Sequence, residues 1–349
     1  MIKVGIDTLP LRNQSAFRGV GNYTQNLIEG LNQYCCNLQV IAGDWRNFWQ
    51  KVDLVHFPYF DFFFPTLPLL KGKKIVVTVH DCIPLIFPEQ YKPGIKGRIK
   101  FFFQKSHLKK ADAIITDSRS SKRDITRFLS FSEEKIHVVY LAPSPQFKII
   151  KSQDLLSSVA KKYRLPKKFV LYVGDVNYNK NLLRLIESFS LVSEENLFLV
   201  LIGKAFENKN LPEVKDIVKK VNELSIAEKV KFLGYIPLED LVVIYNLASV
   251  YCQPSLYEGF GLQILEAMAC GCPVVTSNVS SLPEIAGNAA VLVNPEKTKE
   301  IAKAIYSIIS DKSFVLNLKD RGLKQAKNFS WKKTSLNTGE IYEKIVKND

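Results

Sequence analysis

The sequence predicts an α/β fold made of two doubly wound domains, each with a parallel sheet covered by helices. Short β-branched runs alternate with segments of helical periodicity along the chain, and strands that alternate with helices form parallel sheets. The chain also has 349 residues, whereas a single hydrophobic core stops growing at roughly 250–300 residues. Two Rossmann-like domains therefore fit the length and the pattern.

The first domain is predicted over residues 1–145. Its expected elements are Ile2–Ile6, a helix over Gly21–Tyr34, Leu38–Ala42, Val52–Phe57, Ile75–His80, Ala113–Thr116, a helix capped by Ser118 or Ser120, and Ile136–Val139. Pro143 and Pro145 then prevent helix continuation and predict an extended connector. We place the domain boundary there.

The second domain is predicted over residues 146–330. Its expected elements are Phe169–Val173, a helix Leu182–Val192, Phe198–Ile202, a helix Val214–Leu224, Val230–Phe232, a helix Leu238–Leu247, Val250–Gln253, a helix Leu262–Ala269, Val274–Thr276 and Ala290–Val293. Helical patterns close the chain, and the last, over residues 331–349, is expected to pack back on the first domain. Two facing sheets would form a cleft at the carboxyl ends of their strands, where α/β folds bind ligands.

The charge, the apolar runs and the cysteines of the sequence limit the partners and the location to be expected. The net charge of +14 and the pI near 9.3 favour anionic partners. No apolar run reaches the roughly 18 residues of a membrane span, and the chain opens on a strand-like MIKVGID. The six cysteines lack CxxC spacing and are expected to be buried, reduced thiols. These features predict a cytoplasmic protein.

A glycine-containing turn after the strand Val250–Gln253 predicts a phosphate site. Gly259 and Gly261 let backbone amides approach a ligand closely, and the free amides of the helix that starts at Leu262 favour an anion. Glu258 and Glu266 flank this segment, and carboxylates accept hydrogen bonds from hydroxyls. We expect Glu258 to bind sugar hydroxyls and Glu266 to bind a ribose diol, with Phe260 in the same donor-binding turn.

These residues resemble the retaining, family 4 type (glycosyl transferases group 1) nucleotide-sugar glycosyltransferases of the GT-B fold. The family signature is a pair of glutamates separated by seven residues, as in EGFGLQILE, and the following AMACGCPVV and SSLPEIAG are also similar. The similarity extends over nearly the whole chain. It implies transfer of a glycosyl unit from a nucleoside diphosphate sugar to a hydroxyl, with retention of configuration and with Glu258 as a catalytic residue.

The segment FVLYVGDVNYNK resembles the family's diphosphate-binding loop, which implies roles for Gly174 and for Lys180 as donor-binding and catalytic residues. The family usually has an arginine directly after the glycine, where this chain has Asp175. A second cation must therefore come from elsewhere, and Arg18 or Arg12 is the candidate.

Two features of the first domain also resemble the family. Arg18, Gly19 and Gly21 match a glycine-rich loop near the donor phosphate and the acceptor, although a GxG can also mark only a tight turn. His80, at the end of a predicted strand, is similar to an active-site histidine that Asp81 would orient; the alternative is a hydrogen-bonded core histidine. His56 has a weaker context.

No Asp-x-Asp occurs in the chain, so neither a divalent metal nor another cofactor is expected, and cationic side chains must neutralise the diphosphate. The predicted activity is a retaining hexosyltransferase that uses a UDP- or GDP-sugar, with GDP-mannose among the candidates. Its acceptor is a glycan or lipid-linked hydroxyl in cell-surface polysaccharide or glycolipid synthesis. The alternatives are a nucleotide-sugar hydrolase or epimerase, and a noncatalytic sugar-nucleotide binding module. Nucleic acid is not expected, because the basic residues lack interleaved aromatics.

The segment Lys92–Lys110 contains seven Lys or Arg residues and no acid. Drawn as a helix, it has an apolar stripe of Ile95, Ile99, Phe102 and Phe103 with basic margins. One interpretation is that this stripe packs on the first sheet while the lysines face water. The other is peripheral contact with an anionic membrane at its inner face, or binding of a phosphorylated lipid acceptor.

Overall fold

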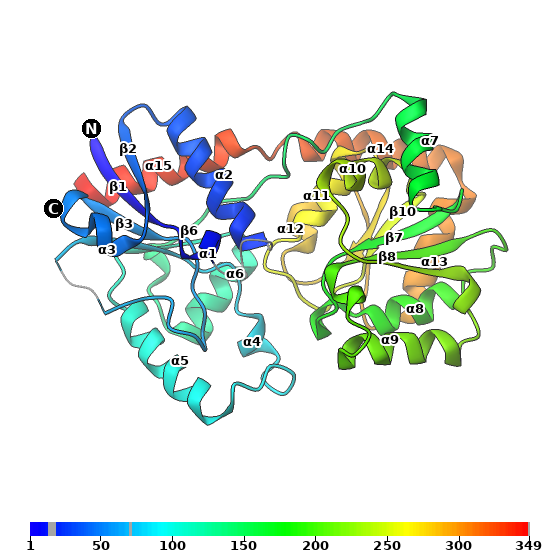
Figure 1. Cartoon of the computed structure of the whole chain (residues 1–349), viewed down its shortest axis with the longest axis horizontal. Coiled ribbons are helices and arrows are strands. Elements are labelled where there is room, and N and C mark those ends of the chain that lie inside the picture. The colour runs from blue at the N-terminus through cyan, green and yellow to red at the C-terminus, as the bar shows by residue number, and fades with distance from the viewer. Residues whose placement is uncertain (13–18, 70–71, 348–349) are drawn as a thin grey trace. The chain divides into compact units, whose positions relative to one another are not determined.

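The computed structural model describes residues 1–12, 19–69 and 72–347 (Figure 1). The chain forms two compact units. Unit 1 comprises Met1–Ala142 and Phe329–Asp349, and unit 2 comprises Pro143–Asn328. Unit 1 is therefore built from two separate stretches of the chain.

Unit 1 contains a parallel six-stranded sheet. Its strands are β1 (Ile2–Asp7), β2 (Leu38–Gly43), β3 (Leu54–Phe57), β4 (Lys74–Thr78), β5 (Ala113–Thr116) and β6 (Ile136–Val138), in the order β2-β1-β3-β4-β5-β6. Strands β3 and β5 are fully buried, as expected inside a sheet covered on both faces, whereas the edge strand β2 is partly exposed. Strand β4 ends at Thr78, so His80 lies two residues beyond the strand that it was expected to end.

Helices flank this sheet on both sides (Figure 1). They are α1 (Leu9–Arg12), α2 (Gly19–Tyr34), α3 (Trp45–Phe48), α4 (Ile83–Ile86), α5 (Gly94–Leu108), α6 (Arg119–Asp124) with a π-helical turn over Ile125–Leu129, and α15 (Trp331–Lys347). The Ser118 side chain accepts a hydrogen bond from the backbone N–H of Ser121, which confirms the predicted cap of α6.

A buried polar network holds α15 against the sheet of unit 1. His56 on β3 forms hydrogen bonds with the Tyr342 hydroxyl of α15, at 2.5 Å, and with the Thr78 hydroxyl, at 2.7 Å. Thr78 also bonds the Tyr23 hydroxyl of α2. Burial lowers the pKa of His56 to about 3, so the imidazole is neutral. His56 therefore has a structural role.

Helix α5 packs on unit 1 through the side opposite its apolar stripe. The four residues of its apolar stripe, Ile95, Ile99, Phe102 and Phe103, are all exposed, whereas the opposite side of the helix is buried through Gly97, Gln104 and Leu108. The expectation that the stripe packs on the sheet is therefore wrong. No helix in the described part of the chain is long and apolar enough to cross a membrane.

Unit 2 contains a second parallel six-stranded sheet. Its strands are β7 (Phe169–Val173), β8 (Phe198–Ile202), β9 (Val230–Leu233), β10 (Val250–Gln253), β11 (Val274–Ser277) and β12 (Val291–Val293), in the order β12-β11-β10-β7-β8-β9. From β7 the chain builds outward through β8 and β9, and then returns to place β10 on the other side of β7. The strand order thus reverses between β7 and β10, and α/β sheets bind ligands at such a switch point.

The helices of unit 2 are α7 (Gln153–Lys162), α8 (Leu182–Ser190), α9 (Pro212–Glu223), α10 (Leu238–Leu247), α11 (Leu262–Ala269), α12 (Leu282–Ala286), α13 (Thr298–Ser310) and α14 (Lys312–Ala326). Helices α8 and α13 contribute Leu185, Ile186 and Ile305 to a core that also contains β7 and β8. All six cysteines are free and five are buried, but Cys36 is exposed, contrary to the prediction for that residue.

Helices α2 and α15 approach closely at a glycine, and this contact can be tested. A Cβ atom at Gly30 would lie 2.1 Å from the Ser335 Oγ and 3.2 Å from its Cβ. We expect Gly30→Ala to lower the free energy of unfolding by about 1–3 kcal/mol, because overpacking displaces α15. Denaturant unfolding measures this effect.

The second substitution Ser335→Ala should restore most of that loss. It removes the clashing oxygen, and this oxygen has no hydrogen-bond partner among the described residues. Gly19→Ala is the matched control on the same helix, since a Cβ atom there has nothing within 4 Å. A Gly30→Ala variant as stable as the Gly19→Ala variant would contradict the close approach.

Candidate functional site

The switch point of unit 2 brings two loops together. The loop after β7 leads to the short 3₁₀ helix η5 (Tyr178–Lys180), and the loop after β10 leads to Glu258. Because β7 and β10 are parallel neighbours, with Leu171 opposite Tyr251, their carboxyl ends meet at one edge of the sheet.

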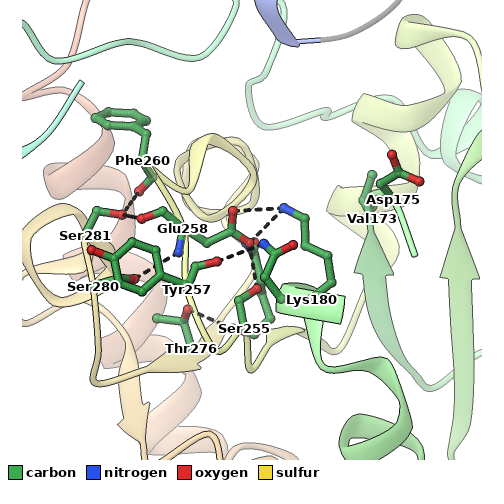
Figure 2. Close-up of polar contacts among 12 residues, drawn as sticks. Val173, Asp175, Lys180, Ser255, Tyr257, Glu258, Phe260, Thr276, Ser280 and Ser281 are labelled. Atoms are coloured by element: carbon green, nitrogen blue, oxygen red, sulfur yellow. Dashed lines mark hydrogen bonds and ion pairs between the residues drawn. The ribbon is translucent and has the colours of Figure 1, made fainter. Parts of the chain in front are cut away.

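A buried ion pair joins these loops. The Lys180 Nζ lies 2.8 Å from Glu258 Oε1 and 2.9 Å from Oε2, and only 14% and 8% of the two side chains are exposed. Figure 2 shows the two side chains pointing toward each other across the gap between their loops. The sequence predicted a role for each residue, and the structure places them in direct contact.

The two oxygens of Glu258 differ in their hydrogen bonding. Oε1 accepts from Lys180, from the Gln253 amide at 2.8 Å and from the Ser255 hydroxyl at 2.7 Å. Oε2 accepts only from Lys180 among the described residues. A carboxylate oxygen has two lone pairs, so Oε2 keeps capacity for a further donor such as a sugar hydroxyl. Sequence reasoning missed Gln253 and Ser255, although polar residues at the end of a buried strand were a usable signal.

Serines after β11 fix the backbone of the turn. The backbone N–H of Glu258 donates to the Ser280 Oγ at 3.1 Å. The Ser281 Oγ lies 2.9 Å from the carbonyl oxygens of both Glu258 and Phe260 (Figure 2). The turn is thus held on both sides of Gly259.

The turn ends in the glycine that the sequence singled out. Gly261 has a φ of +95°, in the left-handed region, and an added Cβ atom would lie 2.6 Å from Leu282 Cδ2. Helix α11 begins at the next residue, Leu262, and no side chain of the described residues caps it. Its first turn therefore presents backbone N–H groups to a ligand, as an anion site requires.

Asparagines secure the loop after β7. The Asn179 side chain donates to the Tyr257 carbonyl at 2.9 Å, and the backbone N–H of Leu256 donates to the Asn179 carbonyl. Asn181 has a φ of +60° and its side chain donates to the carbonyls of Pro254 and Pro295. These bonds fix the direction from which Lys180 reaches Glu258.

Glu266 lies on α11 apart from this ion pair. Its Oε2 accepts a hydrogen bond from the Tyr245 hydroxyl at 3.0 Å. Burial raises its pKa to about 7, and the Tyr245 hydrogen bond offsets only part of that effect. A carboxyl group with this pKa changes charge near neutrality. A ligand that donates hydrogen bonds to it would therefore shift its protonation state.

Gly174 and Asp175 follow β7. The Asp175 carbonyl accepts from the Tyr172 hydroxyl, and the Asp175 Oδ1 accepts from the backbone N–H of Val176. Figure 2 shows Asp175 apart from the Lys180–Glu258 pair. Asp175 therefore supplies no positive charge to the loop after β7.

In unit 1, His80 has a different orienting residue from the one expected. Its Nδ1 lies 2.7 Å from Asp117 Oδ2, and its Nε2 lies 3.2 Å from the Pro58 carbonyl. Asp81 instead accepts from the backbone N–H of Ile83. Burial lowers the pKa of His80, but the charge and hydrogen bond of Asp117, together with the charge of Asp81 and the bond to the Pro58 carbonyl, outweigh burial and leave the pKa raised. Sequence reasoning missed Asp117, whose signal was its position directly after β5.

The glycine-rich loop of unit 1 is described only in part. Arg18 lies outside the described residues, whereas Gly19 and Gly21 lie in the first turn of α2. Arg12 pairs with Asp44 at 3.2 Å and approaches Asp7 at 3.6 Å. Its charge is therefore already compensated within unit 1. Nowhere in the described ranges do three or more His, Cys, Asp or Glu residues gather so as to hold a metal ion.

Comparison with known proteins identifies the family. The model of the family described as glycosyl transferases group 1 matches residues 158–328, and that of glycosyltransferase family 4 matches residues 41–142. The O-antigen chain mannosyltransferase B of Escherichia coli is 34% identical over 279 residues, which cover 78% of this chain and 70% of that protein. The chain belongs to the glycosyl transferases group 1 family.

Other relatives agree with this assignment. A serotype-specific mannosyltransferase of Escherichia coli is 29% identical over 265 residues, or 75% of this chain, but the match spans only 32% of that longer protein. Sucrose-phosphate synthase from Thermosynechococcus elongatus has the same fold, with a TM-score of 0.80, 19% identity and full coverage of both chains. The predicted GT-B class of two doubly wound α/β units is confirmed, and the chain is a glycosyltransferase.

The raised pKa of Glu266 predicts a pH-dependent effect on stability. A glutamate whose pKa rises from 4.5 to about 7 on folding favours the folded state while protonated. That contribution is complete below pH 4.5 and is lost as the pH rises through 7. Glu266→Gln stays neutral, so its gain in stability over the parent should be less than about 1 kcal/mol at pH 5 and as much as about 3 kcal/mol at pH 8.

Denaturant unfolding at the two pH values measures this difference. Glu284→Gln removes one carboxyl group in the same way on the neighbouring helix α12 and is the matched control. A Glu266→Gln effect that is equal at pH 5 and pH 8 would contradict a raised pKa.

Proposed function

We propose that this glycosyltransferase is a retaining hexosyltransferase that moves a sugar from a nucleoside diphosphate sugar to a hydroxyl of a growing polysaccharide. The observation that carries the proposal is the buried Lys180–Glu258 ion pair beside the start of α11. It combines a cation, a carboxylate with a vacant lone pair and a helix N-terminus at one sheet edge. These are the groups that a diphosphate sugar needs.

Lys180 and α11 stabilise the leaving group in this proposal. The ammonium group has three N–H donors, and Glu258 takes two of them at 2.8 and 2.9 Å. The third can point to a phosphate oxygen, while the amides at Gly261 and Leu262 face the other oxygens. Negative charge develops on the diphosphate as the glycosidic bond breaks, so donors fixed in advance lower the barrier.

Glu258 and Glu266 bind different hydroxyl groups of the donor. Glu258 Oε2 accepts from a hydroxyl of the transferred sugar, which holds the anomeric carbon over the diphosphate. Glu266 accepts from the ribose diol, and such donors favour its ionised form. Gly174, Gly259 and Phe260 line the same donor-binding loops. Unit 1 has the acceptor role, with His80, oriented by Asp117, as its catalytic group and with Gly19 and Gly21 in its phosphate or acceptor loop.

The sugar and acceptor are proposed from the relatives. Both Escherichia coli relatives are named as mannosyltransferases, and one is named for the O-antigen chain. We propose a mannosyl unit, GDP-mannose as the donor and a surface glycan as the acceptor. A cytoplasmic location accords with a nucleotide-sugar donor.

Substitutions at the ion pair test the donor site. Glu258→Gln and Lys180→Ala should each lower kcat by on the order of a hundredfold, because each removes a charged hydrogen bond at the reacting diphosphate sugar. Glu187→Gln is the matched control, since it breaks a pair with Lys220, at 3.1 Å, on a helix of the same unit. It should leave kcat within about twofold of the parent.

The assay follows consumption of GDP-mannose and of other nucleotide sugars, with and without a glycan acceptor, and NMR reads the anomeric configuration of the product. Release of free sugar without glycan product would favour the hydrolase alternative. Consumption of no donor would favour the binding module. Inversion at the anomeric carbon would contradict retention.

Activity should not require a divalent metal, because Lys180 and the start of α11 supply the positive potential at the diphosphate. Assays in excess EDTA should give the same rate as untreated enzyme. Loss of activity in EDTA that magnesium or manganese restores would sink this prediction.

A further inference from the structure

Helix α5 of unit 1 presents large apolar side chains to its surroundings. The exposed fractions are 81% for Ile95, 54% for Ile99, 73% for Phe102 and 55% for Phe103. With 3.6 residues per turn, these positions fall on one side of the helix, which we call the α5 outer face. Single exposed apolar residues are ordinary, but four on one helical face mark an interaction surface.

The opposite side of α5 is fixed to the unit. Gln104, on that side, accepts hydrogen bonds from the backbone N–H groups of Thr66 and Leu67 and donates to the Leu67 carbonyl at 2.9 Å. Phe101 packs against the rings of Phe62 and Phe63. The helix therefore cannot rotate to bury its outer face without leaving the buried Gln104 amide unsatisfied.

Positive charge borders the outer face on both sides. By helical geometry, Lys96 and Lys100 lie along one margin, and Arg98 and Lys109 lie along the other. All four are exposed, and within the described chain none forms an ion pair with a carboxylate. The exposed Phe64 ring extends the apolar surface next to Lys100, whose Nζ lies 5.3 Å from the ring centroid.

We propose that the α5 outer face and these flanking cations bind the surface of a bilayer that contains anionic lipid, with the helix lying in the plane of the interface. The 15 residues of α5 are too short and too charged to span a bilayer. An apolar face between Lys and Arg margins is the pattern of a helix that inserts its apolar side among headgroups. The cations then face lipid phosphates.

Charge favours the bilayer over a second copy of the chain. Two copies joined through this face would bring their uncompensated cations together, and residues 92–110 contain no acid to offset them, whereas an anionic surface compensates all of them. The inference does not depend on the proposed donor chemistry, since vesicle binding requires no turnover.

Vesicle cosedimentation of the full chain tests the proposal. The vesicles are phosphatidylcholine alone, or phosphatidylcholine with about a third phosphatidylglycerol, in low and in high salt. We expect binding to the anionic vesicles in low salt, weaker binding in high salt and little binding to phosphatidylcholine alone.

Two variants separate charge from apolar insertion. Replacing Lys96, Arg98, Lys100 and Lys109 by Gln should weaken partitioning at least about tenfold, since each cation near anionic lipid contributes about fivefold. The triple substitution Ile99→Ser, Phe102→Ser and Phe103→Ser should also weaken it at least about tenfold. The control replaces four exposed lysines of unit 2, Lys161, Lys209, Lys215 and Lys312, by Gln. It removes the same net charge and should change partitioning by less than about twofold.

Thermal unfolding verifies that every variant is folded. The proposal is overturned if the parent fails to bind anionic vesicles in low salt, if both α5 variants bind like the parent, or if the unit 2 control loses as much binding as the charge variant. It is also overturned if vesicle binding is absent and the parent is a dimer that the triple Ser variant converts to a monomer, because the outer face would then join two copies.

Discussion

The ion pair between Lys180 and Glu258 is the interaction on which the geometry of the proposed donor site depends. Both charges are largely removed from water, and leaving one of them without its partner would cost about 3–5 kcal/mol. The partners are 78 residues apart in sequence, so the pair ties the loop after β7 to the loop after β10. Serines and asparagines then fix each loop's backbone, so the site is formed before a ligand arrives.

The strand order explains why this pair forms where it does. Only at the reversal between β7 and β10 do two loops leave the same edge of the sheet toward opposite sides. Gly261 completes the arrangement, because its left-handed backbone lets α11 start directly beneath the turn. In unit 1 the buried network of His56 and Tyr342 joins α15 to the sheet in an analogous way.

The sequence predicted the architecture because the spacing of hydrophobic residues and the composition of strands are local properties of the chain. It also predicted that Glu258 and Lys180 matter, but not that they touch, because contacts across 78 residues depend on strand order. Sequence adjacency points to Asp81 as the partner of His80, yet Asp117, at the end of the neighbouring parallel strand, lies closer in space. The stripe on α5 was visible in the sequence, but periodicity does not say which face of a helix is buried. Hydrogen bonds of Gln104 decide that question.

The discontinuity of unit 1 sets an order for folding during synthesis. Residues 1–142 are synthesised before unit 2, whereas Tyr342, which completes the hydrogen bonds of His56, is synthesised after it. Unit 2 is a continuous stretch and can finish its core while the first sheet still lacks α15. Until then the site of α15, including Gly30 and the buried His56, faces solvent. The surface of unit 1 that binds α15 is therefore without its partner helix while unit 2 is being translated.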